Sequence, residues 1–170
     1  MIIGIDAGIT GAITFYDPSS HFIEVYDIPT KALLVNGKTK AGNQKKRKQI
    51  DYPELLGILK MFKGRLVTDV MIEKVHATPN DGAIQAFNFG RVYGEILGLC
   101  YGLGFNISLC SPQAWKREFN LLNCSKDDSR LLAIEIFETD YFKRKKDHNR
   151  ADSALIAAYG HKVLNIDSSA

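Results

Sequence analysis

Apolar residues cluster at the N-terminus of the chain and predict a strand that is buried on both faces. Four of the first five residues are large and apolar, and the run ends at an acid, Asp6. Gly8 and Gly11 follow and allow the chain to turn tightly. The next apolar run, Ala12 to Asp17, predicts a hairpin partner, and strand signals over His21 to Ile28 add a third strand. These runs predict an antiparallel meander.

Helical and strand patterns alternate along the middle of the chain. Apolar residues recur at helical spacing after a predicted N-cap at Asp51. A buried strand is predicted over Val67 to Ile72, and it also ends in an acid, Glu73. A helix is predicted from about Ala83 to Gly102, and a short strand from Asn106 to Cys110.

Three more helices are predicted towards the C-terminus. The first covers Gln113 to Phe119, the second is capped by Ser125 and runs through Phe137, and the last opens within Asp147 to Asp152. Three antiparallel strands followed by alternating helices and strands predict an α/β fold, with a mixed central sheet flanked by helices. A length of 170 residues predicts one domain with a substantial core.

The predicted helix over 83–102 carries a glycine at every fourth position from residue 90 onward. Its apolar residues predict a largely buried helix, and each interior glycine costs roughly 1 kcal/mol relative to alanine. That cost favours close approach of another backbone, which is either the sheet or a second subunit. Arg91 and Glu95 interrupt the pattern and exclude a membrane-spanning interpretation. The glycines are Gly90, Gly94, Gly98 and Gly102.

Positive charge is gathered in two segments, although the net charge is only +3. Such clusters suit a polyanion, and a solvated surface is the alternative. The first segment, about 36–49, is rich in Lys, Gly and Asn and poor in apolar residues, which predicts a flexible basic loop. The second is the run 143–146, made of Lys143, Arg144, Lys145 and Lys146.

The three cysteines indicate a reducing compartment. They are odd in number and widely spaced, without a paired metal-ligand pattern. The chain enters its first strand without a basic and then apolar leader, and no uncharged apolar stretch reaches membrane-spanning length. We therefore expect a soluble protein that is not secreted, located in the cytoplasm of a bacterial or virus-infected cell.

Four carboxylates occupy positions that suggest a metal site. Asp6 and Glu73 end buried strands, Asp147 precedes the last helix, and Asp152 lies in its first turn. Hard oxygen ligands without paired Cys or His point to Mg²⁺ or Mn²⁺. Two such ions roughly 4 Å apart can activate a water and stabilise the leaving oxygen of a phosphodiester. Each acid alone has a structural alternative as a capping or ion-paired residue, but their order favours the metal site.

Several motifs together resemble the RuvC-type Holliday junction resolvases of the ribonuclease H-like superfamily. The resemblance covers nearly the whole chain and is closest to the phage and plastid branch, where a Pro-Gln-x-Trp-Lys segment is usual. The motifs are Gly4-Ile5-Asp6-Ala7-Gly8, Ile72-Glu73, Ala86-Phe87-Asn88-Phe89-Gly90-Arg91, Ser111-Pro112-Gln113-Ala114-Trp115-Lys116 and Arg150-Ala151-Asp152-Ser153-Ala154-Leu155.

This resemblance implies a ribonuclease H-like nuclease domain over residues 1–170 and a structure-selective endodeoxyribonuclease. It implies a homodimer that makes paired nicks in four-way DNA, using two Mg²⁺ ions per site for which Mn²⁺ can substitute. The implied metal ligands are Asp6, Glu73, Asp147 and Asp152.

One position departs from the bacterial pattern. The residue three before the last aspartate is Asn149, where the bacterial enzymes have an acid or a histidine. Asp147, five positions before, has the spacing of the phage and plastid branch and is the preferred fourth ligand. The adjacent His148 is a candidate to orient a water or a phosphate in catalysis.

Candidate DNA contacts come from the basic segments and from the resemblance. The position at which the family inserts an aromatic residue into the junction is His76 here, and it can stack on a base. The others are candidate phosphate contacts, for which ordinary solvated surface is the alternative. The full set is Lys45, Lys46, Arg47, Lys48, His76, Arg91, Lys116 and Arg117.

Two other functions are compatible with parts of the sequence. The stretch from Gly4 to Ala12 resembles the first phosphate loop of actin-like kinases and chaperones, so the chain could be a fragment of an ATP-binding phosphotransferase. Those proteins need two such domains, and this chain has room for one. The other alternative is a catalytically silent junction-binding protein, in which the acids act as structural caps.

Overall fold

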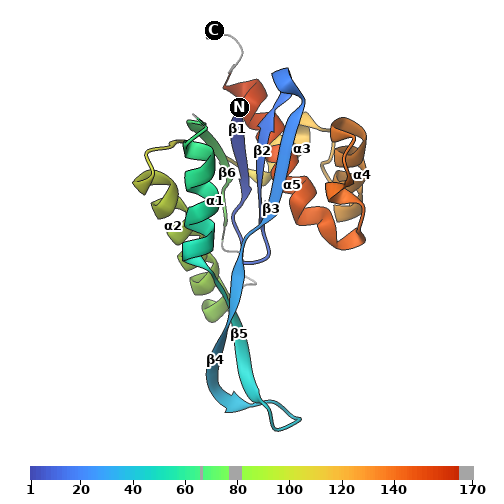
Figure 1. Ribbon diagram of the computed structural model, residues 1–170. Helices are drawn as coiled ribbons and strands as arrows, with labels where there is room; N and C mark the ends of the chain where they lie inside the picture. Colours follow the sequence, from blue (N-terminus) through green and yellow to red (C-terminus); the bar gives the residue numbers. More distant parts are fainter. Residues whose placement is uncertain (66, 77–81, 165–170) are drawn as a thin grey trace.

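A five-stranded mixed sheet forms the centre of the fold (Figure 1). The computed structural model describes residues 1–65, 67–76 and 82–164. The strand order is β3-β2-β1-β6-β7, with β1, β2 and β3 antiparallel and with β6 and β7 parallel to β1. The predicted meander and the mixed sheet are therefore confirmed. The strands are β1 (Ile2–Asp6), β2 (Ala12–Asp17), β3 (Phe22–Asp27), β6 (Asp69–Glu73) and β7 (Asn106–Cys110).

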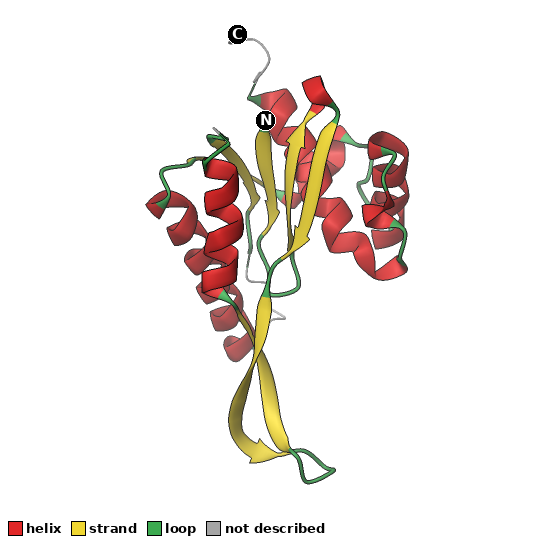
Figure 2. Cartoon of the chain, in the orientation of Figure 1, coloured by secondary structure: helices red, strands yellow, loops and turns green. Residues whose placement is uncertain are grey.

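Helices cover both faces of the sheet (Figure 2). Successive residues of β1 point to opposite faces, so Ile3 and Ile5 join one hydrophobic cluster and Ile2 joins the other. The first cluster includes side chains of α1 (Tyr52–Lys63) and α2 (Ala83–Gly102). The second includes side chains of α3 (Pro112–Glu118), α4 (Lys126–Phe137) and α5 (His148–Val163). All five helices correspond to helices predicted from the sequence.

Gly4 allows α5 to lie directly against β1. A Cβ atom at residue 4 would come within 2.3 Å of the Ser153 carbonyl oxygen and 2.4 Å of the Ala157 backbone nitrogen. A buried hydrogen bond of 2.7 Å between the hydroxyls of Thr14 and Ser153 fixes the same helix to β2. The part of α5 around Ser153 and Ala157 is therefore held against the middle of β1.

Most of the basic segment 36–49 lies in strands, so the prediction of a flexible loop is wrong except at the turn over residues 39–43. Strands β4 (Thr30–Lys38) and β5 (Gln44–Ile50) pair with each other as a separate two-stranded sheet. We call residues 30–50 the arm, because the hairpin projects away from the body of the molecule (Figure 1). Its residues are almost all exposed, so backbone pairing and not an apolar face holds it together. The sequence therefore lacked the alternating apolar signal of a strand.

Helix α2 has the predicted bounds but is not largely buried, so that expectation is wrong. Only Val92, Ile96 and Cys100 are buried, whereas Ile84 is 80% and Phe87 is 70% exposed. A Cβ atom on any of its four spaced glycines would meet nothing within 4 Å among the described residues. The sheet does not approach this glycine face. The contact of this face with a second subunit stays a prediction.

Two observations concern the environment of the protein. No helix in the described residues is long and apolar enough to cross a membrane. Cys100, Cys110 and Cys124 are all free thiols, the first two buried and the third exposed.

Candidate active site

Three of the four predicted acids meet at the C-terminal edge of the parallel strands. Asp6 ends β1 and Glu73 ends β6, and these strands are paired in register with Ile5 opposite Ile72. Asp152 lies just beyond the first turn of α5, one turn later than the sequence predicted, on the helix that Gly4 holds against β1. We call Asp6, Glu73 and Asp152 the acid cluster.

Burial and mutual repulsion raise the pKa values of the acid cluster. Burial raises the pKa of Asp6 to about 7, and the negative charges of Glu73 and Asp152 add to the effect. Burial also raises the pKa of Glu73 and that of Asp152 above their usual values. Carboxylates held close in a desolvated site are costly to ionise unless a cation compensates them.

A hydrogen bond from a buried tryptophan orients Glu73. The Nε1–H of Trp115 donates to Oε1 of Glu73 over 2.9 Å, and the indole is completely buried. This bond opposes the effect of burial and lowers the pKa of Glu73. The Pro-Gln-x-Trp-Lys segment thus supports the acid cluster from α3, a role that the motif alone did not reveal.

One oxygen of Asp152 has no hydrogen-bond partner among the described residues. Its Oδ1 atom is buried and makes no hydrogen bond with the described residues, while the hydroxyl of Ser129 bonds to this carboxylate. A buried, unpaired carboxylate oxygen beside two other acids suits a hard divalent cation. Among the described residues, no three His, Cys, Asp or Glu side chains converge tightly enough to enclose a metal ion.

Two lysines oppose the negative charge of the acid cluster. Lys116 lies on α3, and its charge lowers the pKa values of all three acids. Lys126, in the first turn of α4, lowers those of Asp6 and Asp152. The sequence suggested Lys116 as a phosphate contact but did not single out Lys126 or Ser129. A lysine that follows a capping serine resembles ordinary helix surface, so no local pattern marked it.

Both predicted histidines lie near the acid cluster. The charge of His148 lowers the pKa of Asp152, and the charge of His76 lowers that of Glu73. His148 is positioned at the start of α5 by a contact of 3.4 Å between its Nδ1 and the Lys145 carbonyl oxygen. His76 is exposed, as a residue that stacks on a base would need to be.

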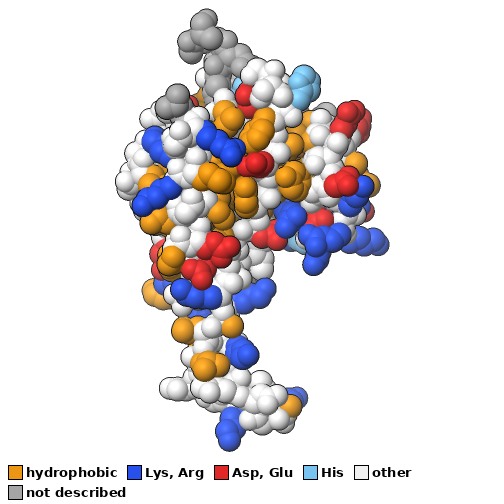
Figure 3. Space-filling view, viewed as in Figure 1, with side chains coloured by type: hydrophobic (Ala, Val, Ile, Leu, Met, Phe, Trp, Pro, Cys, Tyr) orange, Lys and Arg blue, Asp and Glu red, His pale blue; other side chains and the backbone are white. Residues whose placement is uncertain are grey.

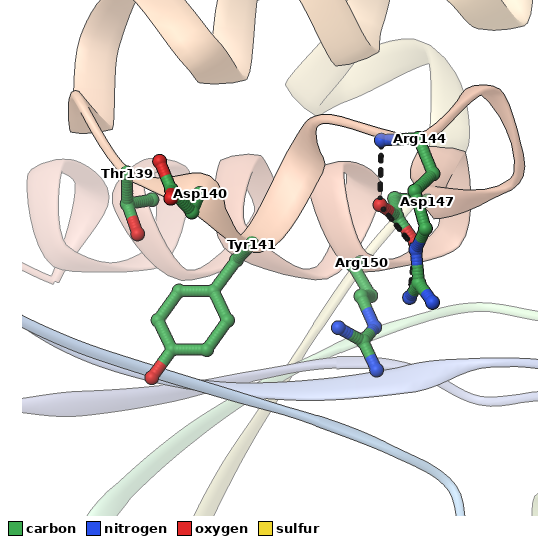
Figure 4. A pocket seen from close by; sticks show the side chains of 6 residues that line it. All are labelled: Thr139, Asp140, Tyr141, Arg144, Asp147 and Arg150. Atoms are coloured by element: carbon green, nitrogen blue, oxygen red, sulfur yellow. Dashed lines mark hydrogen bonds and ion pairs between the residues drawn. The ribbon is translucent and has the colours of Figure 1, made fainter.

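The structure does not bring the fourth predicted acid, Asp147, to the acid cluster. Its buried carboxylate accepts bonds from the Arg144 guanidinium, the shortest 2.8 Å, and from the Arg144 backbone nitrogen over 2.9 Å. Figure 4 shows this pair at the edge of an open cavity of about 540 Å³ that Asp140 and Tyr141 also line. Arg144 keeps the pKa of Asp147 below its usual range. The local arginine competes successfully for this carboxylate.

Asn149 and Arg150 fix the loop and strand that adjoin the acid cluster. The amide of Asn149 donates to the Thr10 carbonyl oxygen over 2.6 Å. Arg150 makes two bonds to Asp27, of 2.6 and 2.7 Å. Both residues therefore act in positioning here, and the carboxamide of Asn149 is turned to the backbone.

The predicted DNA contacts fall into three places. Lys45, Lys46, Arg47 and Lys48 lie on β5 of the arm, where Arg47 bonds to Asn88 of α2. Lys116 lies at the acid cluster, and Arg117 is exposed on α3. Arg91 is paired with Glu95 over 2.7 Å and lies near the arm, in a cavity lined by Phe87 and Arg47.

Comparisons with known proteins agree with this architecture. No family model matches the chain. The Holliday junction resolvase MOC1 (chloroplastic) of Chlamydomonas reinhardtii is 37% identical over 84 residues, which are 48% of this chain but only 10% of that protein. A structure of Thermus thermophilus RuvC matches with a TM-score of 0.53 and 17% identity over 96% of both chains.

A second structure, T. thermophilus RuvC in complex with a Holliday junction substrate, gives a TM-score of 0.55 at 14% identity, over 96% of this chain and 95% of that one. The chain therefore has the ribonuclease H-like fold of RuvC, and the resemblance to this group that its motifs suggested is confirmed.

Proposed function

We propose that this protein is a structure-selective endonuclease that cuts four-way DNA junctions by hydrolysing phosphodiester bonds. The observation that carries the proposal is the acid cluster, three partly buried carboxylates at the end of β1 and β6 and on α5. Its setting on a RuvC fold and the similarity to a junction resolvase support the choice of branched DNA as the substrate.

The activity depends on a divalent cation, with Mg²⁺ as the natural ion and Mn²⁺ as a substitute. Asp6, Glu73 and Asp152 would hold it, and when bound it supplies a polarised water and charge stabilisation at the scissile phosphate. The raised pKa of Asp6 and the unpaired Oδ1 of Asp152 support a cation at this place.

Several side chains of the protein contribute to the same reaction. Trp115 holds the Glu73 carboxylate in a fixed orientation. Lys116 and Lys126 supply positive charge where the phosphate must approach three acids. His148, beside Asp152, orients the attacking water or the phosphate. Asp147 stays ion-paired with Arg144 and stabilises the start of α5.

The protein acts as a homodimer, because two symmetric cuts need two active sites. The candidate interface is α2, whose exposed Ile84 and Phe87 and open glycine face lack a partner among the described residues. Bare glycine positions let two helices approach closely. The three free cysteines support an assignment to a reducing compartment such as the cytoplasm.

Cleavage of a synthetic four-way junction tests this function. Wild-type protein with Mg²⁺ is expected to cut the junction and to leave linear duplex, an RNA–DNA hybrid and a flap largely intact. The variants Asp6→Asn, Glu73→Gln and Asp152→Asn are expected to lose cleavage and to keep junction affinity. The matched control, Glu54→Gln, changes an exposed acid on α1 and should behave like wild type.

The alternatives give different results in the same experiment. Junction binding without cleavage by the wild type would indicate a silent binding protein. Parallel loss of binding and cleavage in the three variants would assign the acids a structural role. A rise in melting temperature with ATP, and none with junction DNA, would favour the actin-like phosphotransferase.

A further inference from the structure

A second polar groove lies beside the acid cluster, between the arm and the start of α5. It has a volume of about 490 Å³ and is formed by the loop after β1, the base of the arm and the segment 144–150. Lys48 of β5 and Lys146, which are distant in sequence, both line it, together with Thr10 and Asn149. Three separate parts of the chain therefore build one groove.

The acids of this groove are already neutralised by arginines. Asp27 is bound by Arg150 through two bonds, and Asp147 is bound by Arg144. These partners keep the pKa values of Asp27 and Asp147 below their usual range, so both acids stay ionised and paired. The charges of the two acids are thus cancelled within the groove.

Lys48 and Lys146 supply the positive charge that is left over. Neither lysine forms an ion pair with another described residue of the chain. Both side chains are exposed, and two uncompensated cations in one groove attract an anion. Most of the residues that line the groove are charged or polar, which suits a charged ligand better than a hydrophobic one.

The two faces of the arm have different neighbours. Side chains alternate along β5, so Lys48 points to the face opposite that of Arg47. Arg47 is bonded to Asn88 of α2. The exposed Lys48 lines both the groove and the cavity beside α2 that Arg47 also lines, so its side chain can reach the groove. Figure 3 shows Lys and Arg side chains on the arm and beneath the α4 and α5 end of the body, on two sides of a recess.

The start of α5 links the groove to the acid cluster, although Asp6, Glu73 and Asp152 do not line the groove themselves. His148 and Asn149 line it, and the charge of His148 acts on Asp152. We propose that this groove seats the phosphodiester backbone of the DNA strand that reaches the acid cluster from the arm, with Lys48 and Lys146 contacting its phosphates. This inference rests on the proposed function and adds the path of the substrate to it.

Salt dependence of binding tests the two lysines directly. Junction affinity is measured by fluorescence anisotropy at several salt concentrations, in EDTA to prevent cleavage. The slope of log K against log salt concentration is negative, and each lost phosphate contact reduces its magnitude by about 1. The double variant Lys48→Ala/Lys146→Ala is therefore expected to bind more weakly and to show a salt slope whose magnitude is smaller by about 2. Lys145→Ala, which removes the adjacent charge outside the groove, is the matched control.

Acetylation of lysines in the wild-type protein gives an independent measurement. DNA is expected to protect Lys48 and Lys146 from the reagent and to leave Lys145 reactive, as read by mass spectrometry. Equal protection of all three lysines, or an unchanged salt slope in the double variant, would refute DNA binding in the groove. The proposed nuclease function would not be affected by either result.

Both measurements are repeated with linear duplex, because the phosphates are common to all DNA. If wild-type protein binds duplex as tightly as the junction and cuts neither, the proposed function fails. DNA binding in the groove is then still tested by the salt slope and by lysine protection measured with linear duplex. If the protein binds no DNA, both proposals fail.

Discussion

The indole nitrogen of Trp115 donates a hydrogen bond to Glu73 over 2.9 Å, and this bond joins α3 to the end of β6. Trp115 is completely buried among side chains of the second hydrophobic cluster, so its ring cannot turn freely. A rigid donor of this kind restricts the carboxylate to one orientation. The packing of the hydrophobic core therefore fixes the orientation of one of the three acids, Glu73.

Removing this donor should slow cleavage without weakening DNA binding. Loss of comparable supporting hydrogen bonds at metal sites costs about 10- to 100-fold in activity or metal affinity. We expect Trp115→Phe to lower the single-turnover cleavage rate within this range and to raise the Mg²⁺ concentration needed for half-maximal rate. Phe142→Leu, which also truncates a buried aromatic residue of the same cluster, is the control for lost packing. An equal loss of rate in both variants would show that Trp115→Phe acts only by destabilising the folded protein.

The sequence and the structure predict different roles for Asp147. If it is a metal ligand, Asp147→Asn should abolish cleavage. Its pairing with Arg144 predicts instead that cleavage stays within a few-fold of wild type, while the free energy of unfolding falls by about 1–3 kcal/mol, as when a buried charge-assisted bond is lost. Urea unfolding and junction cleavage on the same preparation check both quantities. An inactive but stable variant would restore Asp147 as the fourth ligand.

The stability of the metal-free protein should fall as pH rises towards 7. Burial raises the pKa of Asp6 from 3.8 in the unfolded chain to about 7 in the folded protein, so the folded state holds this proton more tightly. Its contribution is fully present below pH about 4 and is lost through pH about 7, and its size is on the order of a few kcal/mol.

Urea unfolding in EDTA between pH 4.5 and 8 measures this effect. Asp6→Asn should flatten the decline and be more stable than wild type above pH 7, and Mg²⁺ should stabilise wild type more than the variant. A decline of the same size in both proteins would assign the pH dependence to other groups. Glu54→Gln serves as the control for removing a negative charge elsewhere.

The glycine face of α2 can be tested by adding side chains to it. Gly94→Leu and Gly98→Leu should not destabilise the isolated subunit, because a Cβ there meets nothing within 4 Å, and each should improve helix propensity by up to about 1 kcal/mol. If this face is the dimer interface, both variants should sediment as monomers at concentrations at which wild type is dimeric. Gly57→Leu makes the same change on the open side of α1 and should leave the dimer intact. Dimers in all three variants would place the interface elsewhere.

The sheet and its acids were predictable because their signals are local. Ile3 and Ile5 alternate with Ile2 and Gly4 along β1, and a single acid ends each buried strand. Such patterns can be recognised in the sequence without knowledge of distant contacts. The positions of Asp6, Glu73 and Asp152 followed from them and from the motifs.

The arm and the support of the acid cluster were not predictable in the same way. The strands of the arm bury no apolar face, so residues 36–49 have the composition of a loop. The bond between Trp115 and Glu73 links residues 42 positions apart, and nothing near Lys126 marks it as a neighbour of Asp6. Arg144 does lie three residues before Asp147, so this pair is a local signal, and it corresponds to the ion-paired alternative that the sequence offered for Asp147.

The missing side chain of Gly4 has a consequence for how this protein can change over time. The backbone of α5 occupies the space of a Cβ at residue 4, so even alanine would push the helix outward by more than an ångström if the carbonyl of Ser153 is to clear it. Asp152 would move with the helix and Asp6 would stay with the strand. A single methyl group at residue 4 would therefore increase the separation of two acids that it never touches.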